Sequence, residues 1–207
     1  MIKELCLQEN FACIHAITPT GGSGKSKYNN EHIDIYERFK FNVDERKGIP
    51  TSIFRNATSY QSKFGPQGLL IYDGIINNAN CTDAGSIFND DKGIWETTEG
   101  INTPDLNHTI NEIQKANGSY VELNIYNYSI CGVFIDLTQL DYCKTCIRTL
   151  KEFYDNTSYY DLPYYGLSSM GIIEINREHI KNEDWIRIQE GTLVSIKDIY
   201  AKEIKTI

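Results

Sequence analysis

The chain has 207 residues and carries 20 Lys and Arg against 28 Asp and Glu, which gives a formal net charge of −8 at pH 7. Net negative charge disfavours non-specific binding to nucleic acid or to an anionic membrane, so a polyanionic ligand would need a local basic patch. The fractions of 41% hydrophobic and 23% charged residues exclude a wholly disordered chain, a collagen and a polytopic membrane protein. This length predicts one domain, residues 1–207, with long loops.

Features of the N-terminus and the cysteine pattern predict the compartment. The first ten residues lack the continuous apolar stretch of a secretory signal. The sequence contains no window of 18 apolar residues, so no membrane span is predicted. The six cysteines are dispersed, which is typical of reduced thiols rather than of a disulfide framework. We therefore expect a cytoplasmic protein with no membrane association.

Strands and two long loops are expected in the first half of the chain. The apolar run 11–17 predicts a buried strand that enters a loop, and alternation predicts a second strand within 33–41. Residues 42–67 turn polar and contain Gly and Pro breakers, so an irregular loop is expected there. A central strand is predicted at 68–72. The weakly patterned segment 77–104 predicts a second long loop, and such loops are usually functional.

Helix signals are stronger in the second half. Thr103 as N-cap and Pro104 as first helical residue predict a helix over about 104–117. A second helix is predicted over about 138–154 because apolar residues recur there at spacings of three and four. The remaining segments predict β structure: a stretch at 120–135, a strand at 171–175, and a terminal hairpin of 186–188 with 192–196. The sequence thus predicts an α+β fold with a mainly antiparallel sheet, two main helices and long irregular loops.

A glycine-rich segment follows the first predicted strand. Gly21, Gly22, Gly24, Lys25 and Ser26 supply the glycines, the lysine and the hydroxyl that a phosphate-binding loop uses. Pro19 stands where that motif requires its first glycine, and the residues after Ser26 are a poor helix start. These residues are candidates for cofactor binding, and a flexible Gly/Ser loop is the alternative.

Cysteine and histidine spacing raises the hypothesis of a zinc-stabilised module. Cys143 and Cys146 are three residues apart, and Cys13 with His15 would complete a set of three sulfurs and one imidazole. Cys143 also belongs to the apolar stripe of the predicted helix 138–154, so packing as a small hydrophobic residue explains it without metal. No metal site is predicted from this pattern, and zinc stays an alternative.

A scattered set of residues resembles mono-ADP-ribosyltransferases. That family opens with a strand carrying a histidine near a threonine, and it presents an aromatic residue and a glutamate near a terminal strand. His15 with Thr18, the pairs Tyr159–Tyr160 or Tyr164–Tyr165, and Glu174 match this scheme. The helix that normally follows the first strand is not predicted here. The resemblance implies a transferase that uses a nucleotide or NAD, with His15 and Glu174 as catalytic residues.

The high tyrosine content favours a function in protein–protein contact. The chain has 14 tyrosines against eight phenylalanines, and tyrosine is enriched at interfaces because it offers contact area and a hydroxyl. Binding through a Tyr-rich loop and the long segment 77–104 is therefore the leading hypothesis, with a protein partner or a second copy of the chain as the ligand. Nucleic acid would need a local basic patch. The predicted contact residues are Tyr159, Tyr160, Tyr164, Tyr165 and Trp95.

Overall fold

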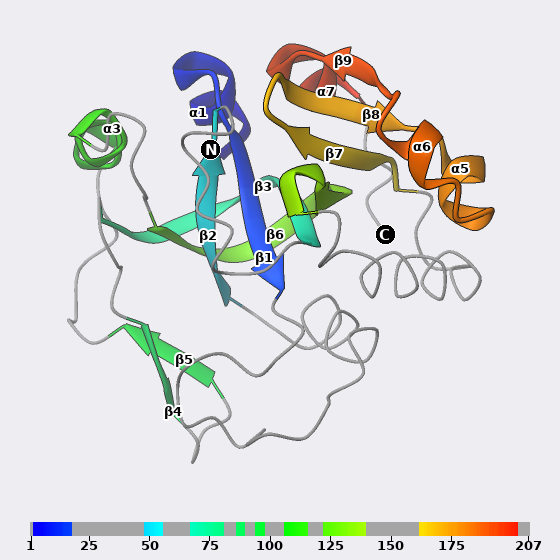
Figure 1. Cartoon of the computed structure of the whole chain (residues 1–207). Coiled ribbons are helices and arrows are strands. Elements are labelled where there is room, and N and C mark those ends of the chain that lie inside the picture. The colour runs from blue at the N-terminus through cyan, green and yellow to red at the C-terminus, as the bar shows by residue number, and fades with distance from the viewer. Residues whose placement is uncertain are drawn as a thin grey trace.

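The computed structural model describes residues 2–17, 48–55, 67–80, 86–89, 94–97, 106–115, 122–139 and 162–202. The main sheet has the strand order β2-β1-β3-β6-β7-β8-β9, and its neighbours are antiparallel except for β6 and β7. This confirms the predicted α+β class with a mostly antiparallel sheet. The elements (Figure 1) are α1 (Ile2–Glu9), β1 (Ala12–Ile17), β2 (Gly48–Phe54), β3 (Gln67–Asn80), β4 (Ser86–Asn89), β5 (Ile94–Thr97), α3 (Leu106–Lys115), β6 (Glu122–Asp136), the 3-10 helix η2 (Leu137–Gln139), β7 (Tyr164–Ser168), β8 (Gly171–Ile175), α5 (Arg177–Lys181), α6 (Trp185–Ile188), β9 (Thr192–Val194) and α7 (Ile196–Ala201).

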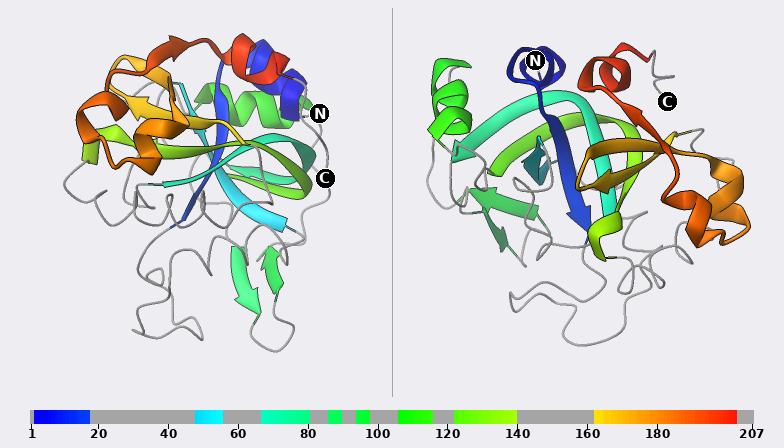
Figure 2. Two further views of the ribbon diagram at one scale, coloured as in Figure 1. Left: turned by 90° about the vertical axis from the view of Figure 1, so that its right-hand side faces the viewer. Right: turned by 45° about the horizontal axis from the view of Figure 1, so that its top comes forward.

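Four strands of the sheet close into a ring, because β2 pairs with β6 as well as with β1. The closure depends on two long strands, β3 with 14 residues and β6 with 15. Register shifts between Leu70 and Asn78 let these strands bend. Asn127, with a positive φ of 47°, lies in the bent part of β6. Figure 2 shows β3 and β6 as curved ribbons.

Strand β1 is buried on both faces, as its continuous apolar run predicts. Ala12, Cys13 and Ile14 have no exposed surface. The helix α1, which the sequence did not predict, packs against β1 and β3, and the Ile2 amide donates to the Asp73 carboxylate at 2.9 Å. Burial on both faces explains why a short run without alternation forms a stable strand.

Both predicted loops contain strands. Strand β2 (Gly48–Phe54) lies inside the predicted loop 42–67 and bonds β1 on one side and β6 on the other. Gly48 and Pro50 lie in this strand although glycine and proline usually interrupt strands, because pairing with two neighbouring strands stabilises the segment. The predicted loop 77–104 contains the end of β3 and the hairpin of β4 and β5. Neither expectation of an irregular loop holds over these residues.

The predicted terminal hairpin is wrong in its first strand. Residues Trp185–Ile188 form helix α6, and Asp184 caps it by accepting a hydrogen bond from the Arg187 amide at 3.2 Å. The partner of β9 is β8. The predicted helices differ in outcome: α3 (Leu106–Lys115) confirms the helix at 104–117, whereas only 138–139 of the helix at 138–154 fall within the described residues, as part of η2.

The predicted strand at 33–41 lies outside the described residues. Among the helices that the structure describes, none has the length and apolarity needed to cross a membrane.

Candidate functional site

A surface pocket of about 430 Å³ lies where β8 ends and β9 begins. Short helices α5 and α6 connect these two strands and supply part of its wall. The lining is polar and carries charge of both signs. The lining residues are Glu174, Asn176, His179, Arg187, Glu190, Gly191 and Thr192.

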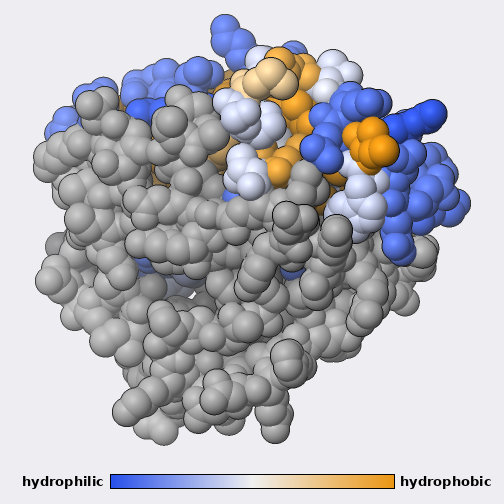
Figure 3. All heavy atoms as spheres, in the orientation of Figure 1, coloured by the Kyte–Doolittle hydropathy of each residue, from blue (hydrophilic) through white to orange (hydrophobic). Residues whose placement is uncertain are grey.

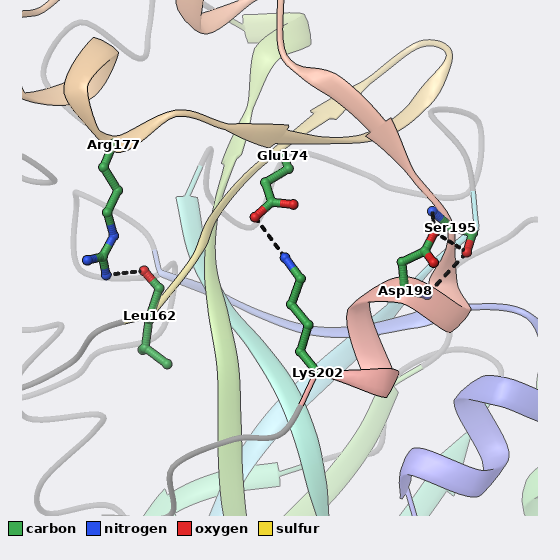
Figure 4. Close-up of polar contacts among 6 residues, drawn as sticks. All are labelled: Leu162, Glu174, Arg177, Ser195, Asp198 and Lys202. Atoms are coloured by element: carbon green, nitrogen blue, oxygen red, sulfur yellow. Dashed lines mark hydrogen bonds and ion pairs between the residues drawn. The ribbon is translucent and has the colours of Figure 1, made fainter.

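Local capping interactions fix the elements around this pocket. Asn176 starts α5 by accepting a hydrogen bond from the Glu178 amide at 2.9 Å. Helix α7 begins with a capping box, in which the Ser195 hydroxyl and the Asp198 carboxylate each bond the other residue's backbone amide. These caps define where each helix begins, and so place the next strand or side chain. Figure 4 shows the Ser195 and Asp198 contacts beside the pair of Glu174 and Lys202.

Ion pairs neutralise most of the charge near the pocket. The Lys202 ammonium lies 2.7 Å from a carboxylate oxygen of Glu174 (Figure 4). Nε of Arg187 lies 3.7 Å from the Asp184 carboxylate. Glu190 has no ion-pair partner among the residues that the structure describes. The pocket lining therefore carries one uncompensated negative charge, at the approach to β9.

Apolar side chains reach the surface on the same C-terminal part of the fold. Met170 is 76% exposed, Leu193 is 54% exposed and Ile186 is 73% exposed. Met170 lies in the turn between β7 and β8, next to Gly171, and a Cβ added to Gly171 would lie 3.7 Å from the Leu193 side chain. Figure 3 shows apolar colour at the surface over this turn and again over α6. We call Met170, Leu193 and the outer edge of β9 the β9 surface.

The sequence did not identify these exposed residues. Leu193 lies in a segment that the sequence predicts as β structure, and alternation within Thr192–Val194 separates two faces. Alternation does not say which face is covered, and it does not say that β9 lies at the end of the sheet. These properties depend on the order of the strands.

His15 and Glu174 are not brought together by the fold. His15 lies on β1, is 5% exposed, and its Nδ1 donates to the Pro50 carbonyl at 2.7 Å. Glu174 lies on β8, four strand positions away in the sheet order. His15 is not among the residues that line the pocket of Glu174. The geometry does not support a single catalytic site built from these two residues.

Two of the predicted contact tyrosines belong to the core. Tyr164 is 1% exposed and Tyr165 is 0% exposed, and burial raises the pKa of Tyr165. The Lys202 ammonium lies 5.6 Å from the centre of the Tyr165 ring. Both residues belong to β7, which lies between β6 and β8. The two rings therefore pack in the core, and the prediction that they are surface contact residues is wrong.

The structure does not test the roles predicted for the remaining site residues. Tyr159, Tyr160 and the glycine-rich segment 21–26 lie outside the described residues. Trp95 lies in β5, which pairs with β4. Contact and cofactor roles for these residues stay predictions.

Of the four predicted zinc ligands, the structure describes Cys13 and His15, and neither supports a zinc site. Cys143 and Cys146 lie outside the described residues. The Cys13 thiol is buried and donates a hydrogen bond to the Thr51 hydroxyl at 3.2 Å. Within the described ranges, no group of three or more His, Cys, Asp or Glu is arranged to hold a metal ion.

Comparison with known proteins adds no family to this description. No protein-family model matches the chain. No curated protein matches it either.

Proposed function

We propose that the protein acts by protein–protein contact and that the β9 surface is one of its contact sites. The observation that carries this proposal is the exposure of two apolar side chains, Leu193 on the last strand of the sheet and Met170 in the turn next to Gly171, where an added Cβ would meet the Leu193 side chain. Isolated exposed apolar residues are ordinary, whereas neighbouring ones beside a polar pocket are typical of an interface. Tyr159 and Tyr160 remain candidates for a second contact.

The β9 surface combines the parts of a small interface. Leu193 and Met170 offer apolar area, and the pocket beside β9 offers carboxylate, guanidinium, imidazole and amide groups. Leu193 and the pocket lie on opposite faces of β9, so a partner that contacts both must run along the edge of the strand. The transferase alternative has no comparable support, because His15 and Glu174 occupy separate places in the fold.

Size measurements on the full chain test the proposal. Gel filtration of a tagged chain in native extract should place the wild type in a species larger than the monomer. Sedimentation velocity of the purified chain then shows whether that species is a complex with another protein or an assembly of copies of this chain. The double variant Leu193→Asp with Met170→Asp should shift it toward the monomer, because two buried charges would be left unpaired in the interface. Ile75→Asp is the matched control, since Ile75 is a 47% exposed apolar residue on β3.

Two results would contradict the proposal. One is a wild-type chain that is monomeric under both conditions. The other is an assembly whose size is the same for the wild type, the double variant and the Ile75→Asp control. Circular dichroism of each variant shows whether a change in assembly reflects loss of contact or loss of fold.

A further inference from the structure

We propose that the outer edge of β9 binds an extended segment of another protein, with an apolar side chain beside Leu193 and a basic side chain in the pocket beside Glu190. This inference rests on the proposed contact function and specifies the partner. Strand addition of this kind obtains affinity from main-chain hydrogen bonds and specificity from pockets for alternate side chains.

The edge of β9 is available for such pairing. Strand β9 ends the sheet order and, within the described part of the chain, pairs with β8 on one side. Thr192 and Leu193 are both exposed, Leu193 by 54%. An exposed strand edge presents backbone N–H and C=O groups that can bond another strand.

Register places the two side-chain subsites on opposite faces of the sheet. Thr192 pairs with Glu174, and Leu193 pairs with Ile173. Thr192 and Glu174 line the pocket, whereas Leu193 lies on the other face. Successive side chains of an added strand also alternate between faces. A partner residue opposite Leu193 is therefore apolar, and its neighbour along the strand reaches the pocket.

Charge selects a basic residue for the pocket position. Glu174 is paired with Lys202 and Arg187 with Asp184, whereas Glu190 has no ion-pair partner among the described residues. A lysine or arginine of the partner would supply the missing counter-charge. The net charge of −8 also opposes pairing of two copies of this chain, which favours a different, basic partner over self-association.

The short length of β9 makes both subsites necessary. A three-residue edge offers few main-chain hydrogen bonds, and very short edge strands are one way in which proteins limit unwanted pairing. Binding would therefore depend on the alternation of apolar and basic side chains as well as on the backbone. Each contribution can be removed separately in a synthetic peptide.

The test uses the full chain and a fluorescent peptide of alternating lysine and valine. Fluorescence anisotropy should show saturable binding, and hydrogen exchange with mass spectrometry should show protection of the amides around 192–194. A peptide methylated on alternate backbone nitrogens should bind about tenfold more weakly, because it loses about two hydrogen bonds. A peptide with glutamate in place of lysine should bind more weakly still.

Protein variants locate the peptide on the surface. Glu190→Gln should weaken binding about threefold, as expected for one exposed ion pair. Glu178→Gln is the matched control, because Glu178 is an exposed acid on α5 that pairs with Lys181 and does not line the pocket. Leu193→Asp should abolish binding.

Several results would overturn strand addition and leave the contact function standing. One is equal binding of the methylated and unmethylated peptides, which would indicate surface contact without main-chain pairing. Another is absence of peptide binding at millimolar concentration while the assembly seen in extract still depends on Leu193 and Met170. A third is a self-associated wild type that Leu193→Asp converts to monomer in purified solution, which would identify a second copy as the occupant.

Discussion

The Tyr200 hydroxyl donates a hydrogen bond to the Ile71 carbonyl at 3.0 Å and accepts one from the Cys13 amide at 3.0 Å. Cys13 and Ile71 are partners in the register of β1 and β3. One side chain from α7, at the C-terminal end of the fold, therefore bridges two strands of the closed ring. The contact with Cys13 joins residues 187 positions apart in the sequence, so α7 and the ring stabilise each other.

Replacing Tyr200 with phenylalanine should destabilise the fold. The substitution leaves a buried amide and a buried carbonyl without the hydroxyl that joins them, which costs about 1–3 kcal/mol of unfolding free energy. Urea denaturation measures the loss. Tyr72→Phe is the control: Tyr72 stacks on Tyr200 with ring centres 6.1 Å apart, but its hydroxyl bonds the Lys3 side chain, so the change should be below about 0.5 kcal/mol. Equal losses in both variants would contradict the bridging role.

Removing the cap of α7 should cost stability. Ser195→Ala deletes the hydroxyl that accepts from the Asp198 amide at 3.1 Å, and loss of an N-cap costs about 1 kcal/mol. Thermal unfolding should show a lower midpoint than for the wild type. Ser169→Ala, at an exposed position in the turn before β8, should leave the midpoint unchanged. A normal midpoint for Ser195→Ala would show that α7 does not depend on this cap.

The Asp198 carboxyl should titrate at unusually low pH. Hydrogen bonds from the Ser195 hydroxyl and backbone amide lower the pKa of Asp198 below its ordinary value of 3.8. A lowered folded-state pKa stabilises the fold at pH values above the unfolded-state pKa, and this contribution is lost as the pH falls through the folded-state pKa. Carboxyl NMR titration should show the low pKa in the wild type and a value closer to 3.8 in Ser195→Ala. An unchanged pKa in the variant would refute the assigned cause.

Three thiols should stay unreactive until the protein unfolds. Burial raises the pKa of Cys6, of Cys13 to about 12, and of Cys131. A raised thiol pKa keeps the group neutral, and the thiolate is the reactive form. Alkylation at pH 8 followed by peptide mass spectrometry should leave these three unmodified in native protein and modify them in urea. Rapid native labelling of Cys13 would contradict its buried position.

Sequence patterns predicted those elements whose signals are local. The apolar run at 11–17 predicted β1, and Thr103 with Pro104 predicted the start of α3 to within a few residues. The apolar segment 171–175 predicted the strand β8. Each of these segments carries its own periodicity or cap, so neighbours along the chain were enough to identify it.

Elements stabilised by distant partners were missed or misassigned. Pro50 lies in β2 although proline usually ends strands, because the two neighbours of β2 supply its pairing. The alternation of Ile186 and Ile188 suggested a strand, whereas the cap from Asp184 starts a helix there. The same cause explains an error in the candidate site. Tyr164 and Tyr165 were predicted at the surface, but they are buried because β7 pairs with β6 on one side and with β8 on the other.

Composition and local pattern by themselves determined that this is an acidic α+β chain with a mainly antiparallel sheet, because charge, hydrophobic content and periodicity are properties of neighbouring residues. Only the tertiary structure decided that β3 and β6 bend to close a ring, that β9 ends the sheet, and that Leu193 and Met170 reach solvent together. The physical reason is that exposure and strand order arise from contacts between segments far apart in the chain, and these contacts leave no periodic signal in either segment.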